Sequence, residues 1–266
     1  MCAICRLFKT NSILMNRDGH FKAMLNGSWV SAFLVKLFLK FPSKIVVQGN
    51  SWRRLLLSYN IPESKVNVIK NWISSESIIT DTPISVSDRA NITFTFIGWL
   101  VKEKGLCELV AAVKNLREKG YLLSVNIIGG GVLEKTLKEN IVKSNIEDCI
   151  KFTGWLEKQE IDSYLEKTHV LVLPSYAEGF PNVILEAMSK GIPVIATKVG
   201  AIPDTILHNV NGTLIDSKSI KSLEYAMKKY INDPNLIQAE SKEVILTVSK
   251  EHDYEENLTK LLNLIK

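Results

Sequence analysis

Six short runs rich in β-branched residues recur between residues 92 and 216, separated by longer stretches whose apolar residues have helical spacing. This alternation is typical of βα units on a parallel sheet. The runs are ITFTFIG (92–98), SVNIIGG (124–130), IKFTG (150–154), VLVLPS (170–175), PVIATKVG (193–200) and GTLID (212–216). We therefore expect a doubly wound α/β domain with six parallel strands, similar to a Rossmann fold.

Connecting helices are predicted between these runs, because apolar residues there return every three or four positions. The predicted helices span 106–119, 133–143, 158–167, 182–190 and 202–207. Sheets of this kind bind ligands at the carboxyl ends of their strands. The loops after the six runs are therefore the expected place for a functional site.

The remaining chain holds one further βα-like unit at 45–59, a run at 66–73 and a polar stretch at 74–88 that is a candidate linker. Helices are predicted at 220–231 and 235–266. The predicted organisation is a partial N-terminal α/β domain with its linker over 1–88, the doubly wound domain over 89–244, and a C-terminal helix over 245–266 that packs back toward the N-terminal domain.

The composition, with 46% hydrophobic and 23% charged residues, is that of an ordinary globular protein. The four cysteines are sparse and irregular, which favours a reducing compartment. Cys2 and Cys5 form a C-x-x-C without a second pair, so we predict no metal site. The net charge of +5 is spread among acids, so we expect no nucleic acid partner.

No signal peptide is expected in MCAICRLFKT, and the longest apolar stretch, 29–39, is shorter than the roughly 20 residues of a membrane span. We expect a cytoplasmic protein. The stretch 27–40 has Trp29 and Phe33 at helical spacing. It suits either a core helix of the N-terminal domain, which we favour, or a helix at the inner face of the membrane.

The strongest candidate for a functional site is the segment PSYAEGFPNVILEAM (174–188), in which Glu178 and Glu186 are separated by seven residues. Gly179 suits a tight turn and Pro181 the first position of a helix. The free amides of residues 182–184 predict a site for phosphate or sugar hydroxyls. Glu186 then accepts hydrogen bonds from a ribose, and Glu178 lies beside a sugar. The alternative is an acidic helix whose glutamates only face solvent.

EGFPNVILEAM, followed by GIPVIATKVGAIPD and NGTLI, resembles the donor-site signature of family 4 glycosyltransferases, which have the two-domain GT-B architecture. FIGWLVKEKG, NIIGGG and FTGWL are similar to the family more weakly. SKIVVQGNSWRRLLLSYNIPESKVNVIKNWI looks like its interdomain region. The resemblance covers about residues 43–232.

This resemblance implies a retaining hexosyltransferase that moves a sugar from a UDP- or GDP-sugar to a glycan or lipid-linked glycan acceptor, in bacterial surface polysaccharide synthesis. It implies no cofactor and no metal, and the chain has no D-x-D. Glu178 and Lys104 take the catalytic roles, with Lys104 at the departing diphosphate. The implied donor-binding residues are Gly98, Trp99, Lys104, Gly130, Thr153, Gly154, Glu178, Gly179, Phe180, Pro181, Asn182, Val183 and Glu186.

The chain departs from the family in two respects. Trp99 stands where the family usually has arginine, and the region before residue 90 is short for an acceptor domain. Asn16 stands nearest to the family's usual histidine and His20 lies four residues on, so no catalytic histidine is assigned. An alternative is therefore a non-catalytic nucleotide-sugar-binding module that needs a partner chain. A dinucleotide oxidoreductase based on Gly129–Gly131 is disfavoured, because Glu134 replaces the third glycine.

Overall fold

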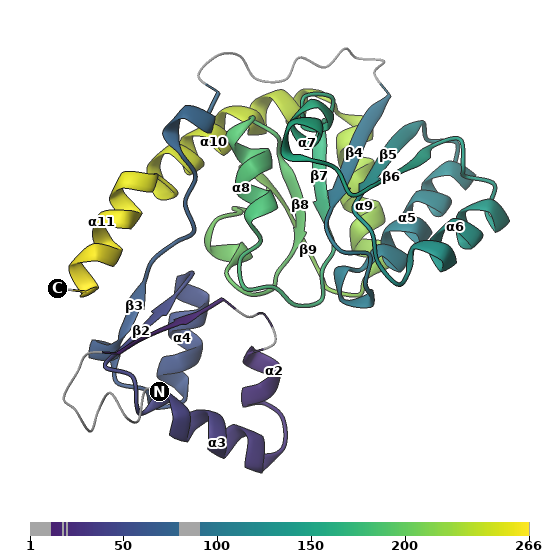
Figure 1. Ribbon diagram of the computed structural model, residues 1–266. Coiled ribbons are helices and arrows are strands. Elements are labelled where there is room, and N and C mark those ends of the chain that lie inside the picture. The colour runs from purple at the N-terminus through teal and green to yellow at the C-terminus, as the bar shows by residue number, and fades with distance from the viewer. Residues whose placement is uncertain (1–11, 18, 20, 80–90, 266) are drawn as a thin grey trace.

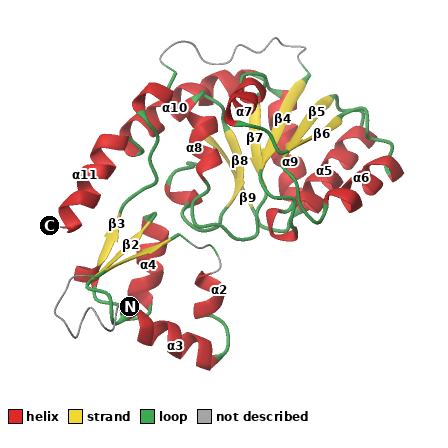
Figure 2. Cartoon of the chain, in the orientation of Figure 1, coloured by secondary structure: helices red, strands yellow, loops and turns green. Residues whose placement is uncertain are grey.

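The computed structural model describes residues 12–17, 19, 21–79 and 91–265. Cys2, Cys5 and His20 lie outside these residues, as does the larger part of the predicted linker 74–88. The described chain contains two parallel sheets, each with its own helices (Figures 1 and 2). The small sheet precedes the large one in the chain.

The large sheet has six parallel strands in the order β6-β5-β4-β7-β8-β9. In chain order this is 3-2-1-4-5-6, the arrangement of a doubly wound nucleotide-binding domain. All six predicted strands are therefore confirmed. Their bounds are β4 Ile92–Ile97, β5 Leu123–Ile128, β6 Ile150–Gly154, β7 Val170–Leu173, β8 Val194–Thr197 and β9 Gly212–Ile215.

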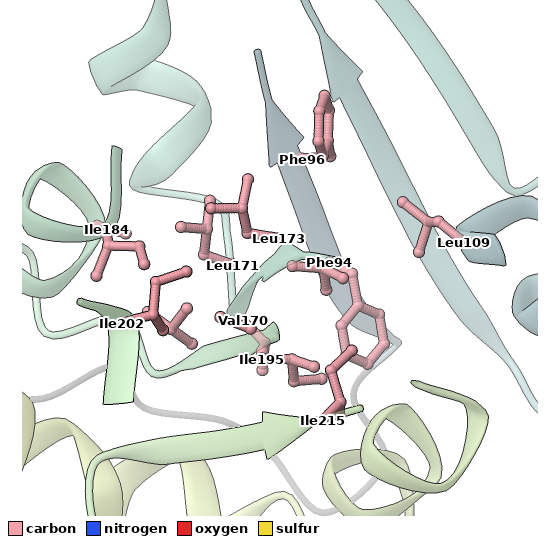
Figure 3. Packing of buried hydrophobic residues seen from close by; sticks show 14 of the residues in the cluster. Phe94, Phe96, Leu109, Val170, Leu171, Leu173, Ile184, Ile195, Ile202 and Ile215 are labelled. Atoms are coloured by element: carbon pink, nitrogen blue, oxygen red, sulfur yellow. The ribbon is translucent and has the colours of Figure 1, made fainter. Parts of the chain in front are cut away.

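Helices cover both faces of this sheet: α5 packs with α6 and α9, and α8 packs with α10. Buried side chains from β4, β7 and β8 meet those of α5 and α8 in one apolar core (Figure 3). The helices are α5 Leu106–Glu118, α6 Glu134–Lys143, α7 Lys158–Leu165, α8 Asn182–Ser189, α9 Ile220–Asn232, α10 Asn235–Glu251 and α11 Tyr254–Ile265.

The small sheet has three parallel strands in the order β1-β2-β3, so the N-terminal part is α/β as expected. After its third strand the chain continues toward the large domain. The elements are β1 Ile13–Asn16, α2 Phe21–Leu25, α3 Trp29–Leu39, β2 Lys44–Val47, α4 Asn50–Ser58 and β3 Val66–Val68. Short 3-10 turns are η1 Glu63–Lys65, η2 Ser75–Ser77, η3 Lys102–Lys104 and η4 Ile202–Asp204.

Three predictions from the sequence are wrong. The helix 202–207 is only the 3-10 turn η4, since the backbone leaves helical angles at Thr205, where φ is −124°. The helix 235–266 is interrupted after Glu251, and α11 starts anew where the Asp253 carboxylate accepts from the Glu256 amide at 2.8 Å. The helix predicted in 27–40 is not a core helix, because only Leu39 of α3 is buried.

The chain passes between the two domains twice, first near Ile73 and again near His252. We call these two segments the first and second crossing, and they lie side by side. The Ile73 amide donates to the His252 carbonyl at 3.0 Å, and the rings of Trp72 and Tyr254 pack edge to face. Beyond the second crossing, α11 runs beside the small sheet (Figure 1), and Lys260 lines a cavity together with Val68. The C-terminal segment thus contacts both domains.

Candidate functional site

The loop between β7 and α8 carries the motif singled out in the sequence. α8 begins at Asn182, where the predicted helix 182–190 also begins, so Pro181, with φ −77°, is the N-cap and not the first helical residue as predicted. The first amides of a helix have no intrahelical partner, so those of Asn182 and Val183 mark a site for hydrogen-bond acceptors. We call residues 178–182, where the sequence predicts donor contacts, the donor loop.

Lys104 and Glu178 meet at the carboxyl ends of β4 and β7. The Lys104 Nζ lies 2.6 Å from Glu178 Oε1, and the side chains are 23% and 11% exposed. These two strands are adjacent, yet the connections that follow them run in opposite directions along the sheet. Such a switch point is where doubly wound sheets bind ligands.

The N-terminal domain packs directly against the donor loop. A Cβ atom at Gly179 would lie 2.3 Å from the Arg17 carbonyl oxygen, so only glycine fits there. The Trp52 indole donates to the Gly179 carbonyl at 3.2 Å, and the Asn71 amide donates to the Phe180 carbonyl at 3.2 Å. The position of the donor loop therefore depends on both domains.

A cavity of about 590 Å³ opens between α4 and the donor loop. Its volume is within the usual range for a small-molecule site. Glu178 lines it from the large domain, where Lys198 also borders it, and Arg54 lines it from α4. This places one predicted catalytic carboxylate in a cleft between the two domains.

Glu186 lines a second cavity of about 650 Å³ together with Lys158 and Asp162. Burial raises the pKa of the Glu186 carboxyl, Lys158 opposes this, and Asp162 adds to it. The two predicted acids thus line different cavities. The helix rises about 1.5 Å per residue, so the Glu186 backbone stands about 6 Å along α8 from Asn182.

Glycines join the ends of β4, β5 and β6. The Gly98 amide donates to the Ile128 carbonyl at 2.9 Å, and the Gly129 amide donates to that of Gly154 at 2.8 Å. A Cβ atom at Gly129, where φ is +127°, would lie 2.0 Å from the Gly98 carbonyl oxygen. Backbone therefore forms this edge of the sheet, next to the predicted diphosphate position.

Trp99 and Trp155 form an exposed aromatic pair at this edge, with ring centroids 4.7 Å apart at 70°. The Trp155 indole lies over Gly130, where a Cβ atom would meet its nitrogen at 2.7 Å. Thr153, predicted near the base, donates to the Gly154 carbonyl at 2.9 Å. Trp155 was not predicted, although the likeness of FIGWL and FTGWL points to it.

Phe180 is buried and stacks on His252, while Val183 is half-buried. His252 and Asn71 were also missed, because no local sequence pattern connects them to the donor loop. Within the described ranges, no cluster of three or more His, Cys, Asp or Glu suits a metal. In the same part of the chain, no helix is both long and apolar enough to cross a bilayer.

Known sequences relate this chain to one family. The model of "Glycosyl transferases group 1" matches residues 79–247, more than half of the chain. An amylovoran biosynthesis glycosyltransferase, AmsK of Erwinia amylovora, is 30% identical over 65% of this chain and 43% of its own length. A capsular polysaccharide biosynthesis glycosyltransferase, CapM of Staphylococcus aureus, is 27% identical over 55% of this chain and 38% of its own. The chain thus spans less than half of either relative.

Solved structures share the fold. Anabaena HepE in complex with UDP has a TM-score of 0.83 at 19% identity, over 98% of this chain and 74% of its own. TarM of S. aureus has a TM-score of 0.81 at 19% identity, over 99% of this chain and 53% of its own. The predicted α/β fold of GT-B type is confirmed, and the oxidoreductase alternative is set aside. The chain belongs to the group 1 glycosyltransferases, a family of transferase enzymes.

Proposed function

We propose that this chain forms the nucleotide-sugar-binding part of a family 4, retaining glycosyltransferase. It moves a hexose from a UDP- or GDP-sugar to a glycan or lipid-linked glycan, in the synthesis of a bacterial surface polysaccharide. The names of AmsK and CapM support the pathway class. The UDP in the HepE complex supports the donor class. The donor binds without a metal or cofactor.

The contact between Lys104 and Glu178 carries this proposal. The donor diphosphate lies at the amides of Asn182 and Val183, with the ribose at Glu186 and the transferred sugar at Glu178. Without a donor, Lys104 neutralises Glu178. When the sugar–phosphate bond breaks, negative charge grows on the leaving diphosphate, and the Lys104 ammonium stabilises it.

The remaining predicted positions surround this path. Gly98 and Gly130 let the diphosphate approach the backbone, and Thr153 and Gly154 flank the base beside Trp99. The acceptor enters the cavity between α4 and Glu178. This assigns the 590 Å³ cleft to the acceptor and the edge of the large sheet to the donor nucleotide.

A thermal-shift panel tests the donor site. Bound ligand raises the unfolding temperature in proportion to RT ln(1 + [L]/Kd). We expect UDP or GDP and one of their sugars to raise it, and Glu186→Gln to reduce the rise, since this variant should bind about tenfold more weakly. Glu139→Gln, an exposed acid on α6, is the control. No shift with any nucleoside diphosphate or its sugar contradicts the proposal.

A donor-binding module without catalysis is the second candidate. Trp99 favours it, because an indole cannot replace the bidentate charge of the family's arginine. The chain also spans less than half of AmsK, so the acceptor side can come from elsewhere. Donor binding without transfer of labelled sugar to any glycan supports this candidate, whereas turnover by the chain alone excludes it.

Peripheral membrane contact is the finer part of the proposal. On α3, Trp29 and Phe33 are 81% and 58% exposed. Residues 19–62 contain six lysines and arginines and no acid. An exposed apolar face in a segment whose charged residues are all cations suits an anionic lipid surface, which also delivers a lipid-linked acceptor.

Vesicle sedimentation tests this contact. We expect binding to vesicles of phosphatidylglycerol and phosphatidylcholine, weaker binding to phosphatidylcholine alone, and loss in Trp29→Ser/Phe33→Ser. Leu122→Ser/Val132→Ser removes equally exposed apolar residues from the large domain and is the control. Equal sedimentation of both double variants overturns the assignment of α3.

A further inference from the structure

Asn71 is only 5% exposed where the two domains meet, and both polar atoms of its side chain make hydrogen bonds. Its Oδ1 accepts from Gln48 Nε2 at 2.8 Å. Its Nδ2 donates to the Phe180 carbonyl at 3.2 Å and to Asn182 Oδ1 at 2.5 Å. One amide therefore connects the end of β2 with both sides of Pro181 in the donor loop.

The main chain of the same residue is held by His252. The Asn71 carbonyl can only accept, so the His252 Nδ1, at 2.6 Å, carries the hydrogen. Burial lowers the pKa of His252 to about 4, so the ring is neutral and Nε2 accepts from Thr205 Oγ1 at 3.0 Å. The ring also stacks on Phe180, with centroids 5.4 Å apart.

These contacts join both domains, the two crossings and the donor loop at one point. Gln48 belongs to the N-terminal domain, Asn71 to the first crossing, and His252 to the second crossing, which pairs with the first at Ile73. Phe180 belongs to the donor loop of the large domain. A rotation of one domain against the other must therefore break these bonds or move the donor loop.

We propose that Asn71 is a positioning residue that couples closure of the two domains to the shape of the donor loop. Its bonds to Phe180 and Asn182 hold the start of α8 in the conformation that receives a diphosphate and exist only while the domains are closed. The bond from Gln48 fixes the same side chain to the small sheet. Donor binding and closure then favour each other through one side chain. The donor-binding half of this inference rests on the function proposed above.

Asn71→Asp is the sharpest variant, because it keeps size and shape. Its carboxylate can still accept from Gln48, but it faces the Phe180 carbonyl, which cannot donate. We expect UDP, measured by calorimetry, to bind about tenfold more weakly, within the usual size of coupling between sites. Asn67→Asp, the same change on β3, where the side chain donates to the Lys65 carbonyl and lies away from the donor loop, should bind UDP as the wild type does.

Urea unfolding, run in parallel, separates positioning from stability. A structural role alone lowers the unfolding midpoint and leaves UDP affinity of the folded protein within about twofold, a result that overturns the proposal. If Asn71→Asp does not fold, Gln48→Met tests the proposal in its place, since it removes the hydrogen bond from Gln48 Nε2 to Asn71 Oδ1 and leaves Asn71 itself unchanged. Weaker UDP binding by this variant supports the coupling, and unchanged binding overturns it.

Small-angle scattering without any ligand gives a readout independent of the donor. We expect Asn71→Asp, or Gln48→Met in its place, to have a larger radius of gyration than the wild type and Asn67→Asp. An unchanged radius overturns the inference. If the wild type itself does not bind UDP or any other nucleoside diphosphate, the proposed function fails, while the scattering comparison still decides whether Asn71 holds the domains closed.

Discussion

Lys104 and Glu178 are 74 residues apart in the chain, yet their side chains meet at 2.6 Å where the ends of β4 and β7 adjoin. Both are largely shielded from water, so each is the other's principal counter-charge. In the function proposed above, a donor diphosphate enters beside them and adds negative charge to this pair. The lysine is then shared between the carboxylate and the ligand, which makes the pair sensitive to substitution.

Lys104→Met removes the counter-charge and leaves the Glu178 carboxylate with less solvation than in water. We expect a loss of about 1–2 kcal/mol in the free energy of unfolding, measured with urea. Glu178→Gln in the same chain should recover part of it, since neighbouring substitutions do not add. Lys114→Met, from an exposed pair with Glu118, should cost less than about 0.5 kcal/mol.

Lys104→Met should also slow sugar transfer by about 10²–10³, the usual effect of losing one group that stabilises transition-state charge. Single-turnover kinetics with a labelled donor measure this rate. A rate equal to that of the wild type would remove Lys104 from the catalytic role.

Glu186→Gln tests the ribose contact through pH. Although Glu186 is exposed by surface area, partial desolvation raises the pKa of its carboxyl above 4.5, so as pH falls the acid gains its proton earlier than a fully hydrated glutamate does. The protonated acid is a poorer hydrogen-bond acceptor, so UDP affinity should fall at a pH above 4.5. The glutamine variant should bind about tenfold more weakly, with no such fall. A pH profile that persists in the variant contradicts this assignment.

His252 predicts acid sensitivity of the fold. Its pKa is lowered from 6.5 to about 4, chiefly by burial. Between these two values the unfolded chain binds a proton that the folded chain refuses, so stability falls as pH decreases from 6.5 to 4. The loss is on the order of 3 kcal/mol. Urea midpoints across this range should show it. His252→Gln should reduce it and leave the smaller part that comes from His169, whose pKa burial also lowers, whereas His208→Gln, at an exposed site, should leave it unchanged.

Asp204 caps a helix of the other domain. Gly49 begins α4 without a side-chain cap, and the Asp204 carboxylate accepts from the Ser51 amide at 2.8 Å and the Ser51 hydroxyl at 2.9 Å. Asp204→Ala should cost about 1–2 kcal/mol in unfolding free energy, as for other caps. Asp148→Ala, at an exposed pair with Arg117, is the control. Equal effects of both would show that Asp204 is no cap.

Local sequence patterns were enough to predict the strands and most helices of the large domain. The six strands and most of its helices follow from runs of β-branched residues and from helical spacing, because the side chains of each element decide which of its faces is buried. The motif from Glu178 to Glu186 was readable for the same reason: strand, turn and helix start are consecutive in the chain. The roles of the predicted site residues and the domain limits remain predictions.

Other features were decided only by tertiary structure. Nothing in the sequence near Asn71, Asp204 or His252 indicates that they meet the donor loop or α4, since the residues that they contact there lie 72 to 153 residues away. Likewise, the apolar spacing of α3 predicts a buried face, but burial needs a second surface, and the described chain leaves all of its large apolar side chains except Leu39 at least partly exposed. Periodicity reports which side of an element is apolar; only the packing of distant segments determines what, if anything, that side touches.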